Sequence, residues 1–498
     1  MKTERAAMLG TACAVVFAIL VGKSSISIVG MDMVKGGFSA LNILIVIWPA
    51  VFLYEMLNEA DVFKSIKCMI QRKTGDELVL LLLICWLFAS FLQGITGFGV
   101  PVAVCAPLLM TVGVKPLWAV MITLLGHAWA NTYGTFALAW DALVAQSELQ
   151  NLFQTEVMTG LLLWGVNVAG AILICWFYGK GKAIRHMLPF ILVIGTIHGG
   201  GQLLVSFANT TIAAFLPTTV ALVVGWLILK AGFYTKEWSM ESKIMNPIKE
   251  KAEKEQEESS GLALFPFALL ALISVIVLLV DPINDVLSRF TIQLSFPAIE
   301  TGRRFRVAAT NAYGTIHLLT HAGFVLLLTV VITYVLYLKM RLLKSGQFGK
   351  ILRATLKKII PTSLGILFLV MMAQVLKGSG LMQLIAQGVT DVTGSFYGAA
   401  VSFVGLLGAF VTSSNTSSNI LLGSFQKTAA DLIGANEAAV LAAQTAGGAV
   451  GTVVGPSTIL LGTTTAGCKG KEGEVLKFML PIVLVEAALT GIVTMFFG

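Results

Sequence analysis

Residues 404–423, VGLLGAFVTSSNTSSNILLG, decide the fold of this chain, because eight consecutive polar residues interrupt an apolar segment. The polar run covers residues 412–419, between the apolar residues 406–411 and 420–422. In lipid, backbone groups without hydrogen-bond partners are costly, so a non-helical break persists only where protein buries it or where it lines a cavity. We therefore expect a broken helix inside a membrane, in preference to a Ser-rich loop outside it.

The same polar run is a candidate anion site. Ser, Thr and Asn are favoured N-cap residues, so a helix that starts within the run directs free amides and the positive end of its dipole at a ligand. We expect this helix start to hold a carboxylate. The substrate-binding candidates in the run are Ser414, Asn415, Thr416, Ser417, Ser418 and Asn419.

Composition places the whole chain in lipid. Of its 498 residues, 56% are hydrophobic and 12% are charged, whereas soluble proteins carry about 25% charged residues. The net charge of +8 comes from short basic clusters between apolar windows, where the positive-inside rule places them, and does not indicate nucleic-acid binding. The recurring apolar windows predict an all-α, polytopic membrane protein of about 12 to 15 membrane segments, some of them re-entrant.

A second break lies in the first half of the chain, at residues 93–101, QGITGFGVP. Its glycines allow tight turns and a close approach of a ligand to the backbone, and Pro101 suits the first turn of a helix. The substrate-binding candidates in this break are Gln93, Thr96, Gly97 and Gly99.

Two shorter polar stretches, residues 127–135 and 444–448, interrupt helices that are otherwise apolar. We expect them to complete the substrate site, although small residues at such positions also allow membrane helices to pack closely. Their substrate-binding candidates are His127, Asn131, Thr132, Gln444 and Thr445.

A weak internal repeat relates the two breaks. Placing Gly113 on Gly434 aligns residues 93–99 with residues 414–420, and each copy reads as helix, break, short helix, turn and broken helix. Acidic residues without lysine or arginine follow the first copy and lysines follow the second, so the positive-inside rule gives the copies opposite orientations. We therefore expect two inverted-topology halves with a site near the membrane midplane.

A charged stretch separates the two halves. Residues 236–260 are rich in Lys and Glu and poor in apolar residues, which is typical of a solvated helix or linker. We expect a cytoplasmic linker at this stretch. The predicted domains are thus an N-terminal transmembrane half, residues 1–235, this linker, and a C-terminal transmembrane half, residues 261–498.

Catalytic and metal chemistry find little support in the sequence. His317 and His321 are four residues apart, a spacing that metal ligands use, but no third ligand is near them. The chain has no phosphate-binding loop and no nucleophile beside an acid–base cluster. We expect no enzymatic activity, no metal site and no cofactor.

Taken in order, these motifs resemble the L-lactate permease family of bacterial inner-membrane transporters. The resemblance rests on GFGVPVAV at residues 97–104, GVKPL at 113–117, the polar run at 412–419 and GKEG at 470–473. It implies a multi-pass protein of the bacterial cytoplasmic (inner) membrane. It also implies uptake of 2-hydroxymonocarboxylates such as lactate or glycolate, coupled to protons.

Four positions depart from what the resemblance implies. An acidic residue is expected where the chain has Gln93, an aspartate where it has Asn415, a lysine where it has Thr452 and an asparagine where it has His127. These departures bear on the specificity of the pocket and on its coupling ion.

With both acids replaced, His127 is the most central titratable side chain near either break, and it is the candidate carrier of the coupling ion. Its imidazole can change charge close to physiological pH, and ionisable groups inside membranes are usually functional. The alternative is a neutral His127 that hydrogen-bonds the substrate. Asp32 and Glu55 are the next candidates for coupling.

These observations predict a secondary active transporter that moves a small organic anion, with a 2-hydroxymonocarboxylate such as lactate or glycolate as the expected substrate and proton symport as the expected coupling. The alternatives are a transporter of another small organic acid with sodium coupling, and a passive anion channel whose filter the breaks line. The expected partners are the substrate anion, a proton or sodium ion and the lipid bilayer, without nucleic acid, and a homo-oligomer stays open.

Overall fold

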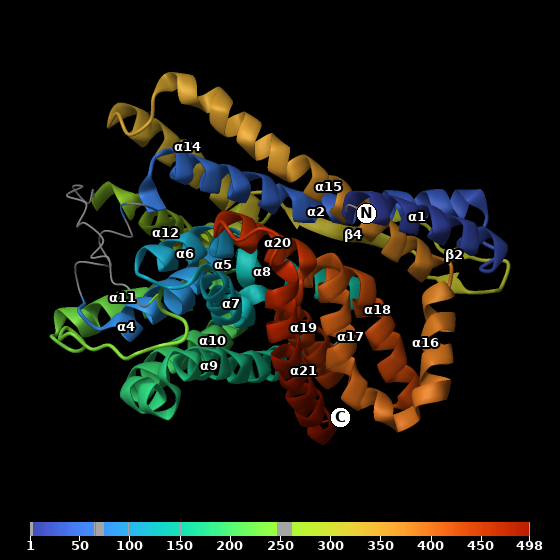
Figure 1. Ribbon diagram of the computed structural model, residues 1–498. Helices are drawn as coiled ribbons and strands as arrows, with labels where there is room; N and C mark the ends of the chain where they lie inside the picture. The colour runs from blue at the N-terminus through green and yellow to red at the C-terminus, as the bar shows by residue number, and fades with distance from the viewer. Residues whose placement is uncertain are drawn as a thin grey trace.

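The computed structural model describes residues 3–63, 65, 74–97, 99–149, 151–246 and 261–497. Helices form nearly all of the regular structure in these residues (Figure 1). Within the described part of the chain, eight helical spans are long and apolar enough to cross a membrane, so the protein is a helical, multi-pass membrane protein, as the sequence predicts. The spans are Ile26–Glu59, Glu77–Ile95, Leu152–Ala208, Thr210–Lys230, Ala322–Lys339, Phe348–Gly378, Glu437–Thr465 and Glu472–Phe496.

Eight long spans are fewer than the 12 to 15 expected segments, because several expected segments are merged, short or bent. The two expected at residues 157–178 and 188–203 both lie in Leu152–Ala208, whose backbone angles are non-helical at Gly179 and Lys180. Further apolar helices include the shorter Val100–Thr111 and Tyr397–Thr412, and the pair Phe265–Leu279 and Asp281–Leu287, which bends by 80°.

The first part of the chain forms a series of membrane helices that is interrupted twice near its middle. A π-helix, η1, and a 3-10 helix, η2, belong to this series. Its elements are α1 (Thr3–Leu20), α2 (Ile26–Glu59), α4 (Glu77–Leu82), η1 (Leu83–Phe88), α5 (Ala89–Ile95), α6 (Val100–Thr111), α7 (Pro116–His127), η2 (Ala128–Asn131), α8 (Gly134–Ser147) and α9 (Leu152–Gly195).

The last part of the chain repeats this series. It contains three 3-10 helices, η6, η7 and η8, and η8 follows α19 as η2 follows α7. Its elements are α14 (Ala322–Lys339), η6 (Ser345–Gln347), α15 (Phe348–Gly378), α16 (Leu381–Thr393), η7 (Gly394–Phe396), α17 (Tyr397–Thr412), α18 (Asn415–Ile433), α19 (Glu437–Gly451), η8 (Thr452–Val454), α20 (Pro456–Thr465) and α21 (Glu472–Phe497).

The 321 positions between Gly113 and Gly434 relate the two series along most of their length. Shifted by 321, α1 falls on residues 324–341 and α2 on residues 347–380, where the chain forms α14 and α15. In the same way α7 falls on α19, η2 on the junction of α19 and η8, α8 on α20, and the first arm of α9 on α21. The repeat therefore extends beyond the two breaks that reveal it in the sequence.

The elements between the two series differ from both. They include a second π-helix, η3, and two antiparallel pairs of strands, which the sequence did not lead us to expect. They are η3 (Thr196–Gly200), α10 (Gly201–Ala208), η4 (Thr210–Ile212), α11 (Phe215–Lys230), η5 (Gly261–Ala263), α12 (Phe265–Leu279), α13 (Asp281–Leu287), β1 (Thr291–Phe296), β2 (Ile299–Glu300), β3 (Arg306–Val307) and β4 (Thr310–His317).

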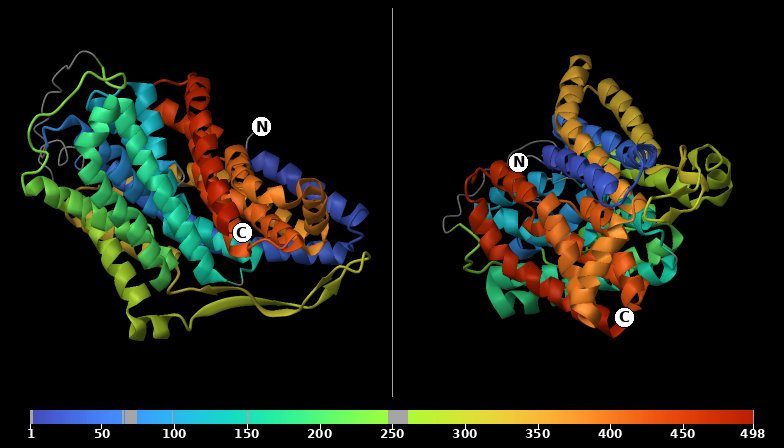
Figure 2. Two further views of the ribbon diagram at one scale, coloured as in Figure 1. Left: turned by 90° about the horizontal axis from the view of Figure 1, so that it is seen from below. Right: turned by 90° about the vertical axis from the view of Figure 1, so that its right-hand side faces the viewer.

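The longer strand pair forms an extended ribbon on one side of the helices (Figure 2). β1 pairs with β4 and β2 pairs with β3, both antiparallel. The ribbon is attached to the first series: the hydroxyls of Ser39 and Tyr313 lie 3.0 Å apart, and the Gly302 amide donates to the Lys23 carbonyl at 3.0 Å. Because backbone hydrogen bonds hold the strands together, the ribbon leaves only a weak signal in the sequence.

The two series run in opposite directions through the molecule. We name its two ends by the residues that lie there, the Asp76 end and the Glu148 end. At the Asp76 end, the bridge partners Trp238 and Met245 pair with Asp76 and with Val114, just before α7. α7, η2 and α8 run from this end to Glu148.

α19, η8 and α20 run the other way. α19 begins at Glu437, which pairs with Lys427 at 3.4 Å, and the Lys427 ammonium donates to the Glu148 carbonyl at 3.3 Å. α20 ends against α7, where Gly462 faces Val120. These opposite directions are those that an inverted-topology repeat requires.

The counterpart helices α2 and α15 pack antiparallel against each other, with α1 beside α15 (Figure 1). Lys350 contacts Glu59 at 2.7 Å near one end of the pair, and Gly378 lies against the Asp32 carboxylate near the other. The two series are thus joined by helices as well as by the linker. Residues 247–260 of the predicted linker lie outside the described residues, and the domain boundaries at 235 and 261 stay a prediction.

Candidate functional site

The break in the first series lies between α5 and α6. Gly97 and Gly99 both have positive φ, 50° and 80°, and Gly99 is the N-cap of α6. A Cβ at Gly97 would lie 2.2 Å from the Thr135 hydroxyl oxygen, so only glycine fits there. The expected break is present, and it brings the start of α6 beside the start of α8.

The break in the second series lies between α17 and α18. α17 ends at Thr412, Ser413 is left-handed with φ of 58°, and Ser414 is the N-cap of α18. The Ser414 hydroxyl accepts a hydrogen bond from the Ser417 amide at 3.2 Å. The first amides of α18, those of Asn415 and its neighbour, precede any intrahelical acceptor and are free for a ligand.

Two further helices begin at the same place. α20 begins at Pro456, and its Ser457 amide donates to the Ser413 hydroxyl at 3.0 Å. α8 begins at Gly134, and the three residues from Thr135 to Ala137 are left-handed, with φ between 51° and 62°. A left-handed residue other than glycine costs about 1–2 kcal/mol, and such strain is typical of functional sites.

The starts of α6, α8, α18 and α20 enclose a cavity of about 60 Å³. A water needs about 10–15 Å³ of such space, so the cavity accommodates a few atoms, the size of a small carboxylic acid. None of the described residues that line it is a lysine or arginine. They are Gln93, Gly99, His127, Asn131, Gly134, Thr135, Ser413, Ser414, Asn415, Thr416, Thr452 and Thr458.

A chain of hydrogen bonds crosses the cavity between the two series. The Gln93 side-chain amide donates to the Asn131 oxygen at 2.9 Å, and the Asn131 amide donates to the Thr452 hydroxyl at 3.0 Å. Asn131 and Thr452 are 321 positions apart and are therefore counterparts in the repeat. The cavity thus lies on the axis that relates the two series.

His127 lines the cavity from the end of α7 and is buried. Its Nδ1 lies 2.6 Å from the Thr123 carbonyl oxygen. Because a carbonyl only accepts, Nδ1 carries the hydrogen, and in the neutral imidazole Nε2 is then an acceptor. This geometry suits a side chain that accepts a hydrogen bond from a ligand.

A second group of predicted residues lies behind the cavity wall and positions Asn415. The Asn415 amide donates to the hydroxyls of Thr132 and Thr445 at 3.2 and 3.3 Å. Asn419 donates to Thr445 at 2.9 Å, and Gln444 donates to the Ser418 hydroxyl at 3.1 Å. These buried polar groups fix the start of α18 against α8 and α19.

Of the predicted substrate-binding residues, seven line the cavity, five lie in the buried network behind it, and the other three hold the breaks. Thr96 bonds to the carbonyl of Leu92 in its own helix, Gly97 packs against Thr135, and the Ser417 amide completes the cap of α18. Five lining residues were absent from the prediction. Three of them, Gly134, Thr135 and Ser413, lie within polar stretches that the sequence indicated, whereas Thr452 and Thr458 lie beyond the stretch at residues 444–448.

The two ends of the site are closed by unlike contacts. At the Glu148 end, polar bonds join α8 to α15 and α18: the Gln146 carbonyl accepts from Ser424 and from Lys377, and Lys377 also contacts Glu148 at 2.7 Å. Toward the Asp76 end, the described contacts between α6 and α20 are apolar, with Leu461 against Gly99 and Gly462 against Val102.

Three lysines act on the Glu148 carboxyl, which lies outside the membrane spans. Burial raises the pKa of Glu148, but the ammonium groups of Lys377, Lys427 and Lys35 lower it by more, so that the pKa lies below its ordinary value. The Lys377–Glu148 pair is therefore present above the ordinary pKa of a glutamate and is lost only as the pH falls through this lower value.

The two histidines considered for a metal have other partners. His317 Nδ1 lies 2.8 Å from the Ser288 carbonyl oxygen, and His321 Nε2 lies 2.7 Å from the Asn42 side-chain oxygen. The described residues contain no group of three or more His, Cys, Asp and Glu side chains that could hold a metal ion.

The remaining coupling candidates lie on α2, away from the cavity. Asp32 contacts Lys35 at 3.8 Å, and Glu55 contacts Lys358 at 2.5 Å. Each acid thus has a lysine partner, which lowers the cost of keeping its charge.

Comparison with known proteins identifies the family of this chain. The family model described as L-lactate permease matches residues 1–498. The L-lactate permease of Bacillus subtilis is 26% identical over 99% of this chain and 92% of its own length, and that of Halalkalibacterium halodurans is 27% identical over 87% and 82%. The glycolate permease GlcA of Escherichia coli is 25% identical over 90% of this chain and 84% of its own.

Among solved structures, the YdaH transporter of Alcanivorax borkumensis aligns with a TM-score of 0.45 at 12% identity, over 96% of this chain and 87% of its own. The match of the family model spans the chain from end to end, and the relatives are permeases, not enzymes. This chain belongs to the L-lactate permease family of membrane transporters.

Proposed function

We propose that this protein is a secondary active transporter that carries a 2-hydroxymonocarboxylate, such as lactate or glycolate, into the cell by proton symport. The proposed location is the bacterial cytoplasmic membrane. One observation carries the proposal: four helix starts converge on a small buried cavity whose described lining residues include no lysine or arginine.

The helix starts supply what an anion needs. A helix start carries a partial positive charge of about half a unit, and the start of α18 also offers amides without an intrahelical acceptor. Together with the neighbouring helix starts, it takes the place of a basic side chain. The free amides at Asn415 and Thr416 suit the carboxylate of the substrate, as anion sites at helix starts do elsewhere. An anion held by dipoles leaves more readily than one paired with a buried lysine, which suits a transporter.

The 2-hydroxyl of the substrate finds an acceptor in His127. With Nδ1 bonded to Thr123, the neutral ring presents Nε2 to the cavity. We assign His127 this neutral role, in which it distinguishes a hydroxy acid from an acid without a hydroxyl. The prediction that His127 carries the coupling proton stays a prediction, and replacement by Asn tests it.

Coupling to a proton follows from charge. Moving one negative charge into a cell with a negative interior costs about 2.3 kcal/mol per 100 mV. A proton that accompanies the anion removes this cost, and its concentration gradient can drive accumulation. Basic residues are frequent at the Asp76 end, among them Lys180, Lys182 and Arg185 at the bend of α9, so we place that end in the cytoplasm.

Uptake into proteoliposomes tests the function. Purified protein is reconstituted, and uptake of a panel of labelled monocarboxylates is measured with an imposed pH gradient, with an imposed sodium gradient and with neither. We expect saturable accumulation of a 2-hydroxy acid that requires the pH gradient. Asn415→Ala should reduce the rate at least tenfold, because it removes the contacts that hold the start of α18.

Ser457→Ala is the matched control, because Ser457 is an exposed serine beside the same site and its amide bond to Ser413 survives the substitution. It should transport like the unmodified protein. Equilibration of the anion without accumulation would identify a channel, and accumulation that depends on sodium alone would refute proton symport.

A further inference from the structure

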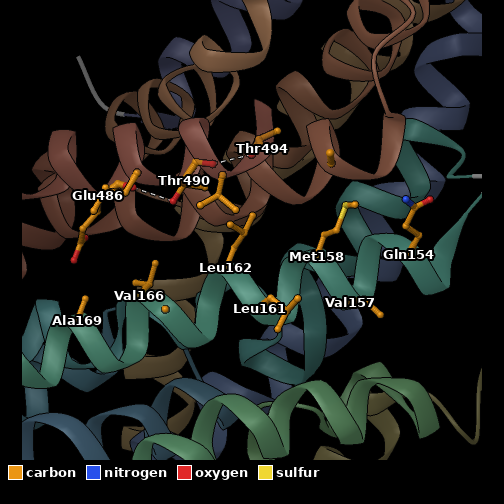
Figure 3. Close-up of a pocket in the computed structure, with 14 residues that line it drawn as sticks. Gln154, Val157, Met158, Leu161, Leu162, Val166, Ala169, Glu486, Thr490 and Thr494 are labelled. Atoms are coloured by element: carbon orange, nitrogen blue, oxygen red, sulfur yellow. Dashed lines mark hydrogen bonds between the residues drawn. The ribbon is translucent and has the colours of Figure 1, made fainter. Parts of the chain in front are cut away.

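A second cavity lies apart from the substrate site, between the first arm of α9 and α21. It is a groove of about 370 Å³ that follows the two helices, with Gln154 at one end and Glu486 near the other (Figure 3). Ala439 of α19 also lines it. Apart from Glu486, its lining residues are uncharged and mostly aliphatic.

Glu486 is the anomaly of this groove. Its side chain is buried, and in the described structure neither carboxylate oxygen has a hydrogen-bond partner. The hydroxyl groups that line the groove are engaged along their own helix: Thr490 donates to the Glu486 main-chain carbonyl at 2.9 Å, and Thr494 donates to the Thr490 carbonyl at 2.8 Å. The carboxyl group therefore faces apolar side chains.

No countercharge lines the groove among the described residues. The elements packed around α21 carry few titratable groups; α20 and η8 carry none, and the lysine and acids of α21 itself lie at its start. The others do not line the groove. The first arm of α9 carries Glu156, Cys175 and Tyr178, and the basic residues of α9, with His186, lie at or beyond its bend. The remaining groups are Glu437 on α19, Tyr397 on α17, and Lys115 and His127 beside or on α7.

An ionised carboxylate without a partner in apolar surroundings is far more costly than a protonated one, so the group keeps its proton there. We infer that Glu486 is a proton-binding site that opens sideways toward the lipid through the groove between α9 and α21. It releases its proton when movement of these helices brings the carboxyl to water.

Glu486 has no acidic counterpart in the first series. The counterpart of Glu486, 321 positions earlier, is Gly165, which lies on the opposite wall of the same groove. A Cβ at Gly165 would meet nothing within 4 Å, so the groove has room on that side. The groove lies between counterpart helices, as the substrate cavity lies between counterpart helix starts.

The groove is linked to the substrate site through α19. Ala439 lines the groove, and one to two turns further along α19 Gln444 and Thr445 hold the network around Asn415. In the transport proposed above, Glu486 is thus the site that carries the coupling proton; this step, unlike the proton site itself, rests on the proposed function.

Dicyclohexylcarbodiimide tests the proton site directly, because this apolar reagent adds to protonated carboxyl groups that are accessible from lipid. The acid proton moves to a carbodiimide nitrogen, the carboxyl oxygen bonds to the central carbon, and an acyl shift to nitrogen leaves a stable adduct that retains the whole reagent. The full-length protein in liposomes is treated at several pH values, and the modified peptide is identified by mass spectrometry.

We expect one adduct, at Glu486, that forms faster at low pH and is absent from Glu486→Gln. Gly165→Leu should slow labelling at least tenfold by filling the groove, whereas Gly181→Leu, at an open position outside it, should not. Gly165→Ala replaces the leucine variant if that variant does not fold. Labelling that spares Glu486, or that Gly165→Leu leaves unchanged, would overturn the site.

Transport assays test the coupling role separately. Glu486→Gln should lose accumulation driven by a pH gradient while it keeps exchange of labelled for unlabelled substrate, because exchange moves no net proton. Retained accumulation would overturn the coupling role. If the unmodified protein moved no monocarboxylate, the proposed function and the coupling role would both fall, and the labelling would still decide whether Glu486 binds a proton.

Discussion

At the scale of single residues, the proposed substrate cavity is built from neutral side chains where the family resemblance leads one to expect charges. Gln93 and Thr452 stand at positions where an acid and a lysine are expected, and both bond to Asn131. An acid and a lysine at these two positions would have opposite charges on either side of one amide. Replacing both residues removes one negative and one positive charge, so the net charge beside Asn131 does not change. Replacing only one of them would leave the other charge without a partner.

A charge-reversion series tests this pairing. Thr452→Lys alone places an unpaired ammonium in a buried cavity, which costs about 3–5 kcal/mol, so we expect lower thermal stability in detergent and little uptake. Gln93→Glu together with Thr452→Lys supplies the partner and should recover most of the stability. The measurement is a double-mutant cycle of unfolding temperatures, and additive losses from the two substitutions would contradict the pairing.

At the scale of elements, the site depends on how closely α19 approaches α17 and α18. A Cβ at Gly447 would lie 2.1 Å from the backbone oxygen of Ser402, whereas one at Gly448 would lie 2.1 Å from the Asn415 side-chain oxygen. The clash with the Ser402 backbone can be relieved only if the two helices move apart, whereas the clash with Asn415 can be relieved by rotation of its side chain. The two neighbouring glycines therefore support different properties, the packing of the bundle and the position of Asn415.

Alanine substitutions separate these two properties. Gly447→Ala should lower the unfolding temperature markedly, because it forces α19 away from α17. Gly448→Ala should keep a folded protein and reduce uptake at least tenfold, since Asn415 must leave its bonds to Thr132 and Thr445. Gly30→Ala, where a Cβ meets nothing within 4 Å, is the matched control and should change neither. Equal stability of the Gly447 and Gly448 variants would refute the distinction.

Sequence patterns predicted both breaks because each is a local signal: Ser414 and its neighbours are N-cap residues, and Gly97 and Gly99 permit positive φ. The left-handed turn at Thr135 was not predictable, because it depends on the approach of α6 and leaves no local pattern. The strands β1 and β4 were missed because most of their side chains are exposed or only partly buried, so no continuous buried face marks either strand in the sequence. The polar stretches thus predicted where the candidate site lies. Only the packing of the helices shows which of their residues line the cavity and which belong to the hydrogen-bond network behind it.

At the scale of the whole molecule, the direction of each series relative to the membrane is set by the lysine distribution. Accessibility of introduced cysteines tests it in a background without the native ones. Asn151→Cys, at the exposed start of α9, should react with an impermeant thiol reagent from outside, and Gly181→Cys and Gly473→Cys should not. Gln146, a natural choice from the sequence, is buried against α15 and α18 and would not report on either side. Labelling of all three from one side would refute the inverted orientation.

The polar contacts of Gln146 and Glu148 have a thermodynamic consequence. A transporter built from an inverted repeat has two conformations, one open to each side of the membrane, and the two series exchange their conformations between them. Contacts that differ between the Glu148 end and the Asp76 end therefore contribute to the equilibrium constant between the two conformations. A typical hydrogen bond is worth about 1 kcal/mol, which changes a population ratio about fivefold. Residues such as Lys377 and Ser424, which do not line the proposed substrate cavity, therefore help to set the fraction of molecules that present an empty site to each side of the membrane, and with it the apparent affinity measured from that side.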